Sequence, residues 1–365
     1  MHKLASALSA FLTVLFLAAS ASAALPAFKV GYIFTTHHTP FLVAATKGEA
    51  FKDQGVYLKP LADKESYELV ENGKPLAVLD FVVTKSGSET ATLFAQKHLD
   101  MALASITAIM AGIDKGTAMK IVCPLQTEGM ALMAPKDSPI SDWASLLAAV
   151  KNAKEPLKIG FHSPTSAPKI VLEGGLKAAG LNVTLNPSDT KADVLLVDLK
   201  ETSNLLASLT AGQVDAVVGP SPFPEVAQVR GLGKVVVQLG DMPPSGKWAN
   251  FPCCVGVASD EMLSKHKDVV NAFVRLMRQA NAWCNANPAE AGALAAKWIG
   301  LPEEAGRKTT LVFLNEFSDN WLAGAASYLG ILNSMKKFSG SLKDKGLDEV
   351  KALLIDASAL EAAKR

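Results

Sequence analysis

The sequence predicts an α/β protein built of two similar lobes, and three observations lead to this expectation. The chain has 365 residues, of which 49% are hydrophobic, which is enough for two packed cores. Over the first two-thirds, short apolar strands alternate with helical segments, as in parallel or mixed sheets covered by helices. Segments 92–107 and 207–222 share one order without a gap: helix end, tight turn, apolar residue, Asp, apolar strand and a small or Pro-rich loop. Two such lobes form a cleft, where ligands bind.

Local patterns place the elements of the first lobe. Residues 28–33 alternate and are rich in β-formers, which predicts a strand. A loop at 35–40 leads to residues 41–52, where apolar side chains recur on one helical face. The polar, turn-rich stretch 60–78 is interpreted as a long irregular connection. Further strands are expected at 56–59, 77–83, 100–104 and 119–124, and further helices at 89–97 and 105–115.

Two extended apolar stretches are interpreted as the connections between the lobes. Residues 128–134 would cross into the second lobe, and residues 250–258 would cross back. Between them we expect strands at 157–161, 194–197, 215–218 and 235–239, and helices at 142–152, 168–179, 201–211 and 224–229. Helices follow at 261–265, 268–286, 288–299, 302–315, 320–333 and 346–363. The expected division is 24–126 for the first part of lobe 1, 127–249 for lobe 2, and 250–365 for the return crossing and the C-terminal helices of lobe 1.

The first 23 residues are predicted to be a secretory signal peptide. Lys3 gives a positive start, residues 4–18 are almost all apolar, and Ala21-Ser22-Ala23 fits a cleavage site after Ala23. The apolar run is too short to span a membrane comfortably. The cleavage site has no Cys, so a lipid anchor is not expected. No later apolar run reaches spanning length. The mature protein is therefore expected to be soluble and periplasmic.

Charge and motifs exclude several functional classes. The formal net charge is +1, and no basic run points to nucleic acid. The sequence contains no HExxH, no GxSxG and no Walker lysine motif. We therefore expect a protein that is not an enzyme, needs no cofactor and binds no nucleic acid.

A series of short motifs resembles the nitrate/sulfonate/taurine-type periplasmic substrate-binding proteins of ABC importers, the NMT1/THI5-like family. The family's usual GxFxxxGLxV run is one residue longer here, where Gly48-Glu-Ala-Phe51 begins it. The resemblance covers about residues 28–300. The motifs that carry it are Lys29-Val-Gly-Tyr, Lys47 to Val56, Ser86-Gly-Ser, Leu99-Asp100-Met-Ala, Pro135 to Ile140, Gly180-Leu-Asn-Val, Leu209 to Ala216, Ala258 to Leu263, and Asn287-Pro-Ala-Glu-Ala.

This resemblance implies a type II two-lobe binding protein. Its mixed sheets would be flanked by helices, and a hinge of two crossing segments would close the lobes over a small molecule. The partner implied is an ABC transporter permease, and the protein is expected to be monomeric. A sensor-associated binding protein is an alternative. A second alternative is an enzyme like the thiamine-pyrimidine synthase, whose cysteine-rich iron motif lies near the return crossing, although only Cys253 and Cys254 match it here.

Candidate ligand-binding residues lie on loops that follow strands and precede helices. In open α/β lobes, ligands bind outside the carboxyl ends of strands, where helix N-termini offer free N–H groups. Helix capping explains several of the hydroxyls equally well. The loops 105–107 and 220–223 follow the repeated strand and are expected to face each other, while Asp100 and Asp215 are expected to be scaffold. The candidates are Thr36, His37, His38, Thr39, Ser86, Gly87, Ser88, Ser105, Thr107, His162, Ser163, Thr165, Ser166, Pro220, Ser221 and Phe223.

The adjacent residues His37 and His38 suggest a metal site, but none is predicted. Two adjacent imidazoles do not easily point at one ion, and no third ligand is spaced nearby. A site that draws ligands from distant loops stays open. A hydrogen bond to the ligand and a solvated loop are the other interpretations.

The four cysteines, Cys123, Cys253, Cys254 and Cys284, form no disulfide framework in their spacing. Cys253 and Cys254 are expected to be core residues on a crossing strand, and Cys284 to be buried in a long helix. The family layout puts Cys123 just before the outgoing crossing, so a disulfide to the Cys253–Cys254 pair is the alternative.

The five candidate loops also constrain the ligand. They contain no Arg, which argues against a bare, highly charged anion such as phosphate. Hydroxyls, imidazoles and Phe223 suit a small organic solute with one polar or anionic head and an apolar or ring portion.

Overall fold

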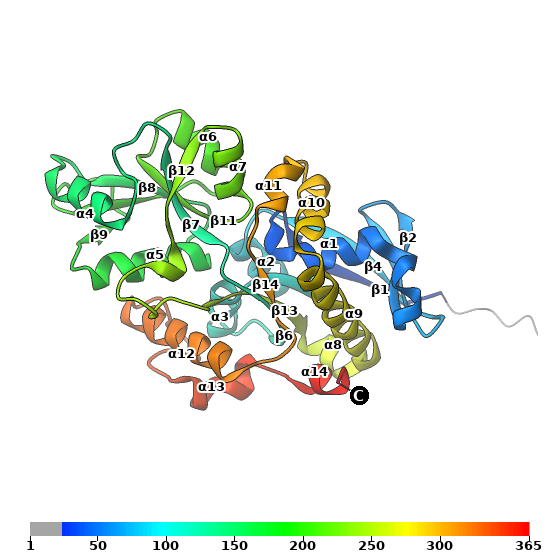
Figure 1. Ribbon diagram of the computed structural model, residues 1–365. Coiled ribbons are helices and arrows are strands. Elements are labelled where there is room, and N and C mark those ends of the chain that lie inside the picture. The colour runs from blue at the N-terminus through cyan, green and yellow to red at the C-terminus, as the bar shows by residue number, and fades with distance from the viewer. Residues whose placement is uncertain (1–23, 365) are drawn as a thin grey trace, which may run out of the picture.

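Two helix-covered β-sheets form two lobes side by side, as Figure 1 shows. The computed structural model describes residues 24–364, so the predicted signal peptide lies outside the described residues. Lobe 1 holds an eight-stranded sheet in the order β14-β6-β13-β5-β1-β4-β3-β2, and lobe 2 a six-stranded sheet in the order β12-β7-β11-β8-β10-β9. The strands are β1 (Ala27–Ile33), β2 (Val56–Ala62), β3 (Ser66–Glu71), β4 (Lys74–Thr84), β5 (Met101–Ser105), β6 (Met119–Thr127), β7 (Met130–Pro135), β8 (Leu157–Phe161), β9 (Val183–Thr184), β10 (Val194–Asp198), β11 (Ala216–Pro220), β12 (Gly233–Gln238), β13 (Pro252–Ser259) and β14 (Val312–Phe313).

Helices cover both sheets, and several of them begin directly after a strand. The α-helices of lobe 1 before the crossing are α1 (Thr39–Lys47), α2 (Gly87–Ala95) and α3 (Ile106–Asp114). Those of lobe 2 are α4 (Trp143–Asn152), α5 (Ala167–Ala178), α6 (Asn204–Thr210) and α7 (Phe223–Val229). After the return come α8 (Asp260–Lys265), α9 (Lys267–Ala286), α10 (Pro288–Trp298), α11 (Glu303–Arg307), α12 (Asp319–Ser334), α13 (Leu347–Leu354) and α14 (Ser358–Ala362). Short 3₁₀ turns are η1 (Thr36–His38), η2 (Gly48–Gln54) and η3 (Leu239–Asp241).

The two sheets repeat one arrangement around the strand that opens each lobe. In lobe 1, β1 lies parallel between β4 and β5, and the returning strand β13 pairs antiparallel with β5. In lobe 2, β8 lies parallel between β10 and β11, and the outgoing strand β7 pairs antiparallel with β11. Each lobe therefore takes one antiparallel strand from a crossing segment. Hydrogen bonds across the lobes join the loops after β1 and β11 and the loops after β5 and β8. The carboxyl ends of these four strands therefore meet at the seam between the lobes, and ligands bind at such ends.

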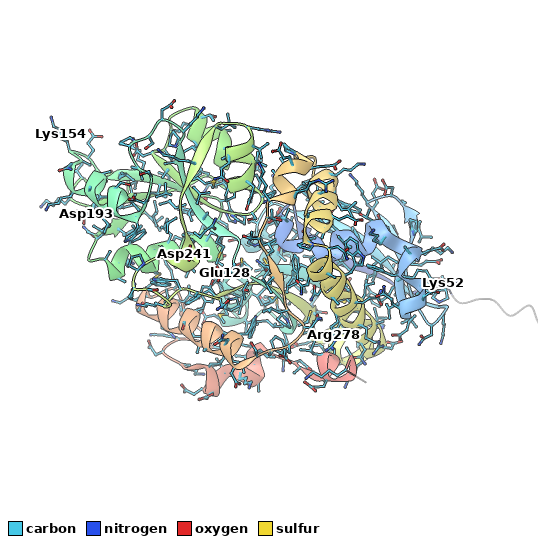
Figure 2. The ribbon with its side chains drawn as sticks, in the orientation of Figure 1. Lys52, Glu128, Lys154, Asp193, Asp241 and Arg278 are labelled. Atoms are coloured by element: carbon cyan, nitrogen blue, oxygen red, sulfur yellow. The ribbon has the colours of Figure 1, made fainter. Side chains whose placement is uncertain are left out.

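The crossing segments are short and tied to each other. The outgoing one turns at Glu128 and Gly129, which both have positive φ, of 65° and 70°. The Glu128 carboxylate accepts a hydrogen bond from the backbone N–H of Asn250 in the returning segment, at 2.5 Å. Figure 2 shows Glu128 and Asp241 beside the crossing, whereas Lys154 and Lys52 lie at the far ends of lobe 2 and lobe 1.

Three sequence predictions about elements were wrong. The stretch 60–78 is a β-meander, in which β2 and β3 and then β3 and β4 pair antiparallel. Its second turn is Asn72-Gly73, with φ of 49° and 77°, a pair typical of tight hairpins. The helix expected at 302–315 stops at Arg307, and β14 then pairs with β6. The helix expected at 346–363 is broken between α13 and α14, where Ile355 forms a bridge with Ile121 of β6.

The helix expected at 41–52 is α1 followed by the 3₁₀ turn η2, and β9 was not predicted. The other predicted strands and helices lie within a few residues of their expected positions. The predicted α/β class, with two lobes, mixed sheets and flanking helices, is confirmed. Among residues 24–364, no helix is both long and apolar enough to cross a membrane.

Candidate functional site

Two pairs of loops join the lobes directly, and together they border the candidate site. On one side, the hydroxyl of Thr35 donates to the carbonyl of Ser221 at 2.7 Å, and the N–H of Thr36 donates to the same carbonyl at 3.3 Å. These contacts link the loop after β1 in lobe 1 with the loop after β11 in lobe 2. The lobes are therefore closed on each other in this structure.

On the other side, hydroxyl groups dominate the contact. The Ser88 hydroxyl lies 2.8 Å from those of both Ser163 and Thr165. Thr107 donates to the carbonyl of Thr165 at 2.6 Å, and Ser105 Oγ accepts from the N–H of Ala167 at 3.1 Å. The loops 105–107 and 220–223 thus both contact the opposite lobe, but each meets a different loop. The repeat had predicted that these two loops would face each other, whereas the hydrogen bonds across the seam join each of them to a different loop.

Four buried polar atoms near this seam have no hydrogen-bond partner among the described residues: Thr36 Oγ1, His38 Nε2, His162 Nδ1 and Glu225 Oε2. They come from both lobes. Their residues are nearly inaccessible, at 0–8% exposed. A buried polar atom without a partner costs free energy. Such a set is expected where a bound molecule supplies the missing partners.

Glu225 is the most costly member of this set, because it is a buried acid. Its Oε1 accepts a hydrogen bond from the Ser221 hydroxyl at 2.8 Å. Burial raises its pKa above the ordinary value, and the Ser221 hydrogen bond and the nearby charge of His37 only partly oppose this. Glu225 lies in the first turn of α7, where the positive end of the helix dipole favours an anion.

A hydrogen bond determines which nitrogen of His38 carries the proton, and burial determines the charge of both His38 and His162. His38 Nδ1 accepts from the N–H of Ile33 at 3.0 Å, so a neutral His38 presents Nε2–H as a donor. Burial, with the charge of His37, lowers the pKa of His38 to about 3 and that of His162 to about 4. Both rings are therefore neutral at physiological pH.

His37 lies at the centre of a second group of contacts. Gln126 Oε1 accepts from the N–H of Cys254 at 2.9 Å, so its amide nitrogen is the end that lies 2.8 Å from His37 Nδ1. In the neutral ring Nδ1 is then an acceptor, and Nε2–H donates to the carbonyl of Gly129 at 2.8 Å. Burial opposes the charged ring, but Cys253 and the Gly129 carbonyl raise the pKa of His37 above its ordinary value. The thiol of Cys253 lies 3.2 Å from Nδ1 and that of Cys254 lies 4.0 Å from it.

The cysteines are free thiols. All four are buried and unpaired among the described residues, so the disulfide alternative with Cys123 is not formed here. The hydrogen bond from Cys254 holds the pKa of Cys253 well below its usual value and raises that of Cys254. Within residues 24–364, His37, Cys253 and Cys254 form a group that could hold a metal ion.

Comparison with known proteins decides the family. A model of the NMT1-like family matches residues 21–300. The chain belongs to the NMT1-like family. The resemblance seen in the sequence is thereby confirmed.

Relatives of this NMT1-like protein include one in sequence and several in structure. An uncharacterized protein of Methanocaldococcus jannaschii, MJ1180, is 37% identical over 110 residues, which are 30% of this chain and 76% of the relative. The zinc-bound ligand-binding component of an ABC-type import system from Staphylococcus aureus has a TM-score of 0.69 at 16% identity, covering 93% of this chain and 99% of its own. The nitrate-binding protein NrtA of Synechocystis has a TM-score of 0.68 at 16% identity, covering 93% and 89%. The alkanesulfonate-binding protein SsuA of Xanthomonas axonopodis, bound to MOPS, has a TM-score of 0.63 at 14% identity, covering 87% and 96%. At these identities the likeness establishes the fold of a periplasmic binding protein.

The NMT1-like fold places the predicted residues in several roles. Thr36, His37, His38, His162 and Ser221 lie in or beside the group of unpartnered atoms. Ser88, Ser105, Thr107, Ser163 and Thr165 form the contact between the lobes, and Ser86 caps α2 by accepting from the N–H of Glu89. The remaining candidates are Thr39, Gly87, Ser166, Pro220 and Phe223, all of which are buried.

Glu225 and Gln126 were missed in the sequence. Glu225 follows Phe223-Pro224 at the start of a predicted helix, where an acid is an ordinary first-turn residue. Gln126 ends an apolar strand and carries no motif. Only Glu225 left a weak signal in the sequence. In the register of the repeat, which pairs Asp100 with Asp215, Glu225 is an acid where the first lobe has the apolar Met110.

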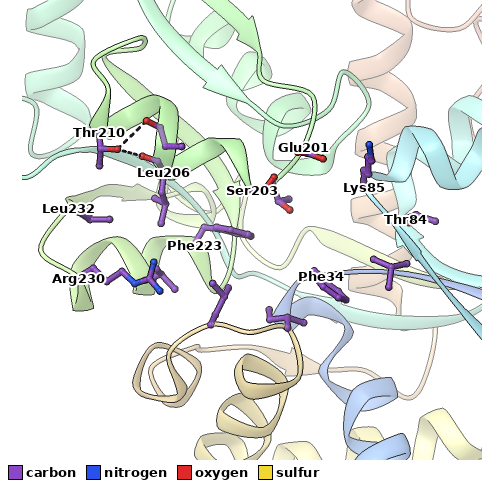
Figure 3. A pocket seen from close by; sticks show the side chains of 16 residues that line it. Phe34, Thr84, Lys85, Glu201, Ser203, Leu206, Thr210, Phe223, Arg230 and Leu232 are labelled. Carbon is purple, nitrogen blue, oxygen red and sulfur yellow. Dashed lines mark hydrogen bonds between the residues drawn. The ribbon is translucent and has the colours of Figure 1, made fainter. Parts of the chain in front are cut away.

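An apolar groove of about 550 Å³ adjoins the Thr35–Ser221 contact. Phe34, exposed at 39%, precedes Thr35, and Phe223 follows the Ser221 loop. Figure 3 shows Phe34 from lobe 1 and Phe223 from lobe 2 on opposite sides of this groove. Lys85, Glu201 and Arg230 lie at its rim with further apolar residues from both lobes.

Proposed function

We propose that this protein is the exported solute-binding component of an ABC importer, and that it delivers a small polar organic solute held between its lobes. The observation that carries the proposal is the set of buried, unpartnered polar atoms contributed by both lobes. Closure over a solute would satisfy them, and the closed form is the one that a permease would recognise. The fold relatives named for nitrate, sulfonate and ABC-type import support this class of function.

The chemistry of the set narrows the solute. Glu225 offers an unpartnered carboxylate oxygen, so the solute would present an N–H donor or a cationic nitrogen there. His38 Nε2–H is a donor that a neutral acceptor of the solute would meet. A bare inorganic anion would lie close to the charge of Glu225, which is unfavourable. The solute therefore differs in its head group from nitrate and simple sulfonates.

A thermal-shift screen of the purified mature protein tests the solute class. Amines, amidines and nitrogen heterocycles with N–H donors are expected to raise the melting temperature, and nitrate, sulfate, bicarbonate and alkanesulfonates are not. Glu225→Gln would weaken the hit, whereas the exposed Glu304→Gln, whose partner is Lys308, serves as the matched control. Stabilisation by inorganic anions alone would contradict the proposal.

The transport role needs its own experiments. Export predicts that the mature N-terminus is Ala24, which mass spectrometry of the purified periplasmic protein would show. Cells that lack the protein should take up the identified solute more slowly. Normal uptake with a lost tactic or signalling response would favour the sensor-associated alternative.

A further inference from the structure

The residues His37, Cys253 and Cys254 bring three ligand atoms together, although His37 and Cys253 lie 216 positions apart in the sequence. His37 belongs to the 3₁₀ turn after β1, and the cysteines belong to the returning strand β13. The atoms concerned all lie within 4.8 Å of one another. His37 is 1% exposed, and the cysteines are 2% and 4% exposed.

The backbone explains how two adjacent cysteines reach one point. Successive side chains of a regular strand point to opposite faces, which would separate the thiols. In β13, Pro252 is paired with Thr127 and Cys254 with Gln126, so Cys253 has no partner of its own and the register shifts there. This is a β-bulge, which re-aims side chains. Its result is a sulfur-to-sulfur distance of 4.0 Å between neighbouring residues.

The distances between the ligand atoms suit one ion. With zinc–sulfur bonds of about 2.3 Å and zinc–nitrogen bonds of about 2.0–2.1 Å, two sulfurs should lie about 3.8–4.0 Å apart and a sulfur and a nitrogen about 3.5–3.8 Å apart. The sulfurs are 4.0 Å apart. The two nitrogen-to-sulfur distances, 3.2 and 4.0 Å, lie on either side of the expected range. Shifts of a few tenths of an ångström would seat the ion.

The surroundings of His37 prepare its ring for coordination. Nε2–H donates to the Gly129 carbonyl at 2.8 Å, which is the usual outer contact of a metal-ligating imidazole. In the neutral ring this leaves Nδ1 as a lone pair next to both sulfurs. Gln126 now donates to that lone pair and would have to turn aside. Gly129 permits the approach, because a Cβ there would lie 2.9 Å from His37 Nε2.

We propose that His37 Nδ1, Cys253 Sγ and Cys254 Sγ form a three-ligand site for a zinc-type divalent ion. Both sulfurs would bind as thiolates, and any proton that they carry before the ion binds would be released to solvent. Two thiolates balance the charge of the divalent ion, so the complex is neutral and its burial is not costly. A monovalent copper ion would leave a negative charge in the same place. Two sulfurs and one nitrogen match zinc in ligand type, and a fourth position is left open.

The test uses the full mature chain, reduced, stripped with a chelator and loaded with Co²⁺. We expect one ion per chain and the sulfur-to-cobalt charge-transfer absorption of thiolate ligands, both abolished by stoichiometric Zn²⁺. Zinc affinity is then measured against a chromophoric chelator. Cys253→Ser, Cys254→Ser and His37→Gln should each weaken it by at least about 100-fold, since loss of a mere outer-shell contact costs about 10–100-fold.

Cys123→Ser and Cys284→Ser are the matched controls, because both residues are buried free thiols outside the cluster. They should leave zinc affinity and the cobalt spectrum unchanged. Circular dichroism shows whether each variant is folded, and His37→Gln keeps both thiols if a serine variant does not fold. The absence of thiolate bands in the cobalt-loaded wild type would overturn the proposal, and so would wild-type zinc affinity in His37→Gln. These readouts are independent of the solute, so they stand apart from the transport proposal.

Discussion

In lobe 1, strand β5 runs into Ser105 and a helix that carries Met110, whereas in lobe 2 the matching strand β11 runs into Pro220 and a helix that carries Glu225. Before these strands, the two units make the same hydrogen bonds. Asp100 accepts from the N–H of Lys29 at 2.8 Å, and Asp215 accepts from the N–H of Lys158 at 2.8 Å. The backbone N–H of Asp100 also donates to the carbonyl of Lys29, and that of Asp215 donates to the carbonyl of Lys158. One unit is used twice as scaffold, and its two ends differ in chemistry.

This difference indicates which lobe determines the specificity for the solute. Met110 is 1% exposed and packs in the core of lobe 1, while Glu225 is 8% exposed at the seam. A buried acid is retained at a cost in stability. The cost is understandable if lobe 2 supplies the charge that recognises the solute.

The largest expected effect comes from giving lobe 1 the residue of lobe 2. Met110→Glu places a carboxylate in an apolar core. No hydroxyl would bond to it, because the residue that matches Ser221 in lobe 1 is Ile106. An uncompensated buried charge destabilises by about 3–5 kcal/mol. Urea unfolding should show a loss of this size, and a loss below about 1 kcal/mol would mean that the two helices are not equivalent.

The reverse exchange should act with the opposite sign. Glu225→Met removes the buried acid and is expected to raise the free energy of unfolding of the unliganded protein by about 1–3 kcal/mol. The same change should weaken solute binding by about 10–150-fold, because a hydrogen bond to a charged group is worth about 1.5–3 kcal/mol. Calorimetry measures both. A variant that is less stable and binds normally would assign Glu225 a purely structural role.

The acid also predicts a pH dependence that the matching residue of lobe 1, Met110, cannot produce. Burial raises the pKa of Glu225, so the folded state holds the proton more tightly than the unfolded state. The destabilisation is then complete above the raised pKa, is relieved as the pH falls through it, and levels off below the ordinary value of about 4.3. The charge of His37 lowers the pKa of Glu225 and partly opposes the effect of burial. The difference in unfolding free energy between wild type and Glu225→Gln should shrink on acidification, whereas a pH-independent difference would contradict this account.

Much of the fold could be predicted because its signals are local. The spacing of apolar side chains that predicts β1 and the long helices can be seen in short stretches of sequence. The same is true of the repeat around Asp100 and Asp215. The hairpin turn Asn72-Gly73 was also a local signal, and the prediction of an irregular connection overlooked it. The break between α13 and α14 was not visible, since it depends on Ile355 meeting Ile121 from a distant strand.

The site was predicted in part, for a physical reason. Loops after strands are recognisable, so His37, His162 and Ser221 were found. What these residues touch depends on closure of the lobes and on a bulge at Cys253, neither of which leaves a pattern in the sequence. The pairing of His37 with two cysteines more than two hundred positions away is a product of the tertiary fold.

If the repeated Asp residues are scaffold, their loss should be equal in the two lobes. Asp100→Ala and Asp215→Ala each remove one acceptor of a backbone N–H. We expect each to lower the free energy of unfolding by about 1–2 kcal/mol and to leave solute affinity unchanged. Denaturant unfolding and binding calorimetry check the two parts. A fall in affinity for one variant alone would show that this Asp belongs to the site.

The smallest expected effect concerns the two contacts that close the lobes. Thr35→Val removes the hydroxyl that donates to Ser221, and Thr107→Val removes the one that donates to Thr165. Each hydrogen bond exists only when the lobes are closed, so its loss should shift the equilibrium toward the open form by about 0.5–1.5 kcal/mol. Solute affinity should then fall by about tenfold at most, since the solute must also supply the energy of closure. X-ray scattering with and without solute would report the open fraction. Equal shifts in the two variants would show that both ends of the seam close together, whereas a shift in Thr35→Val alone would assign closure to the side that carries Glu225.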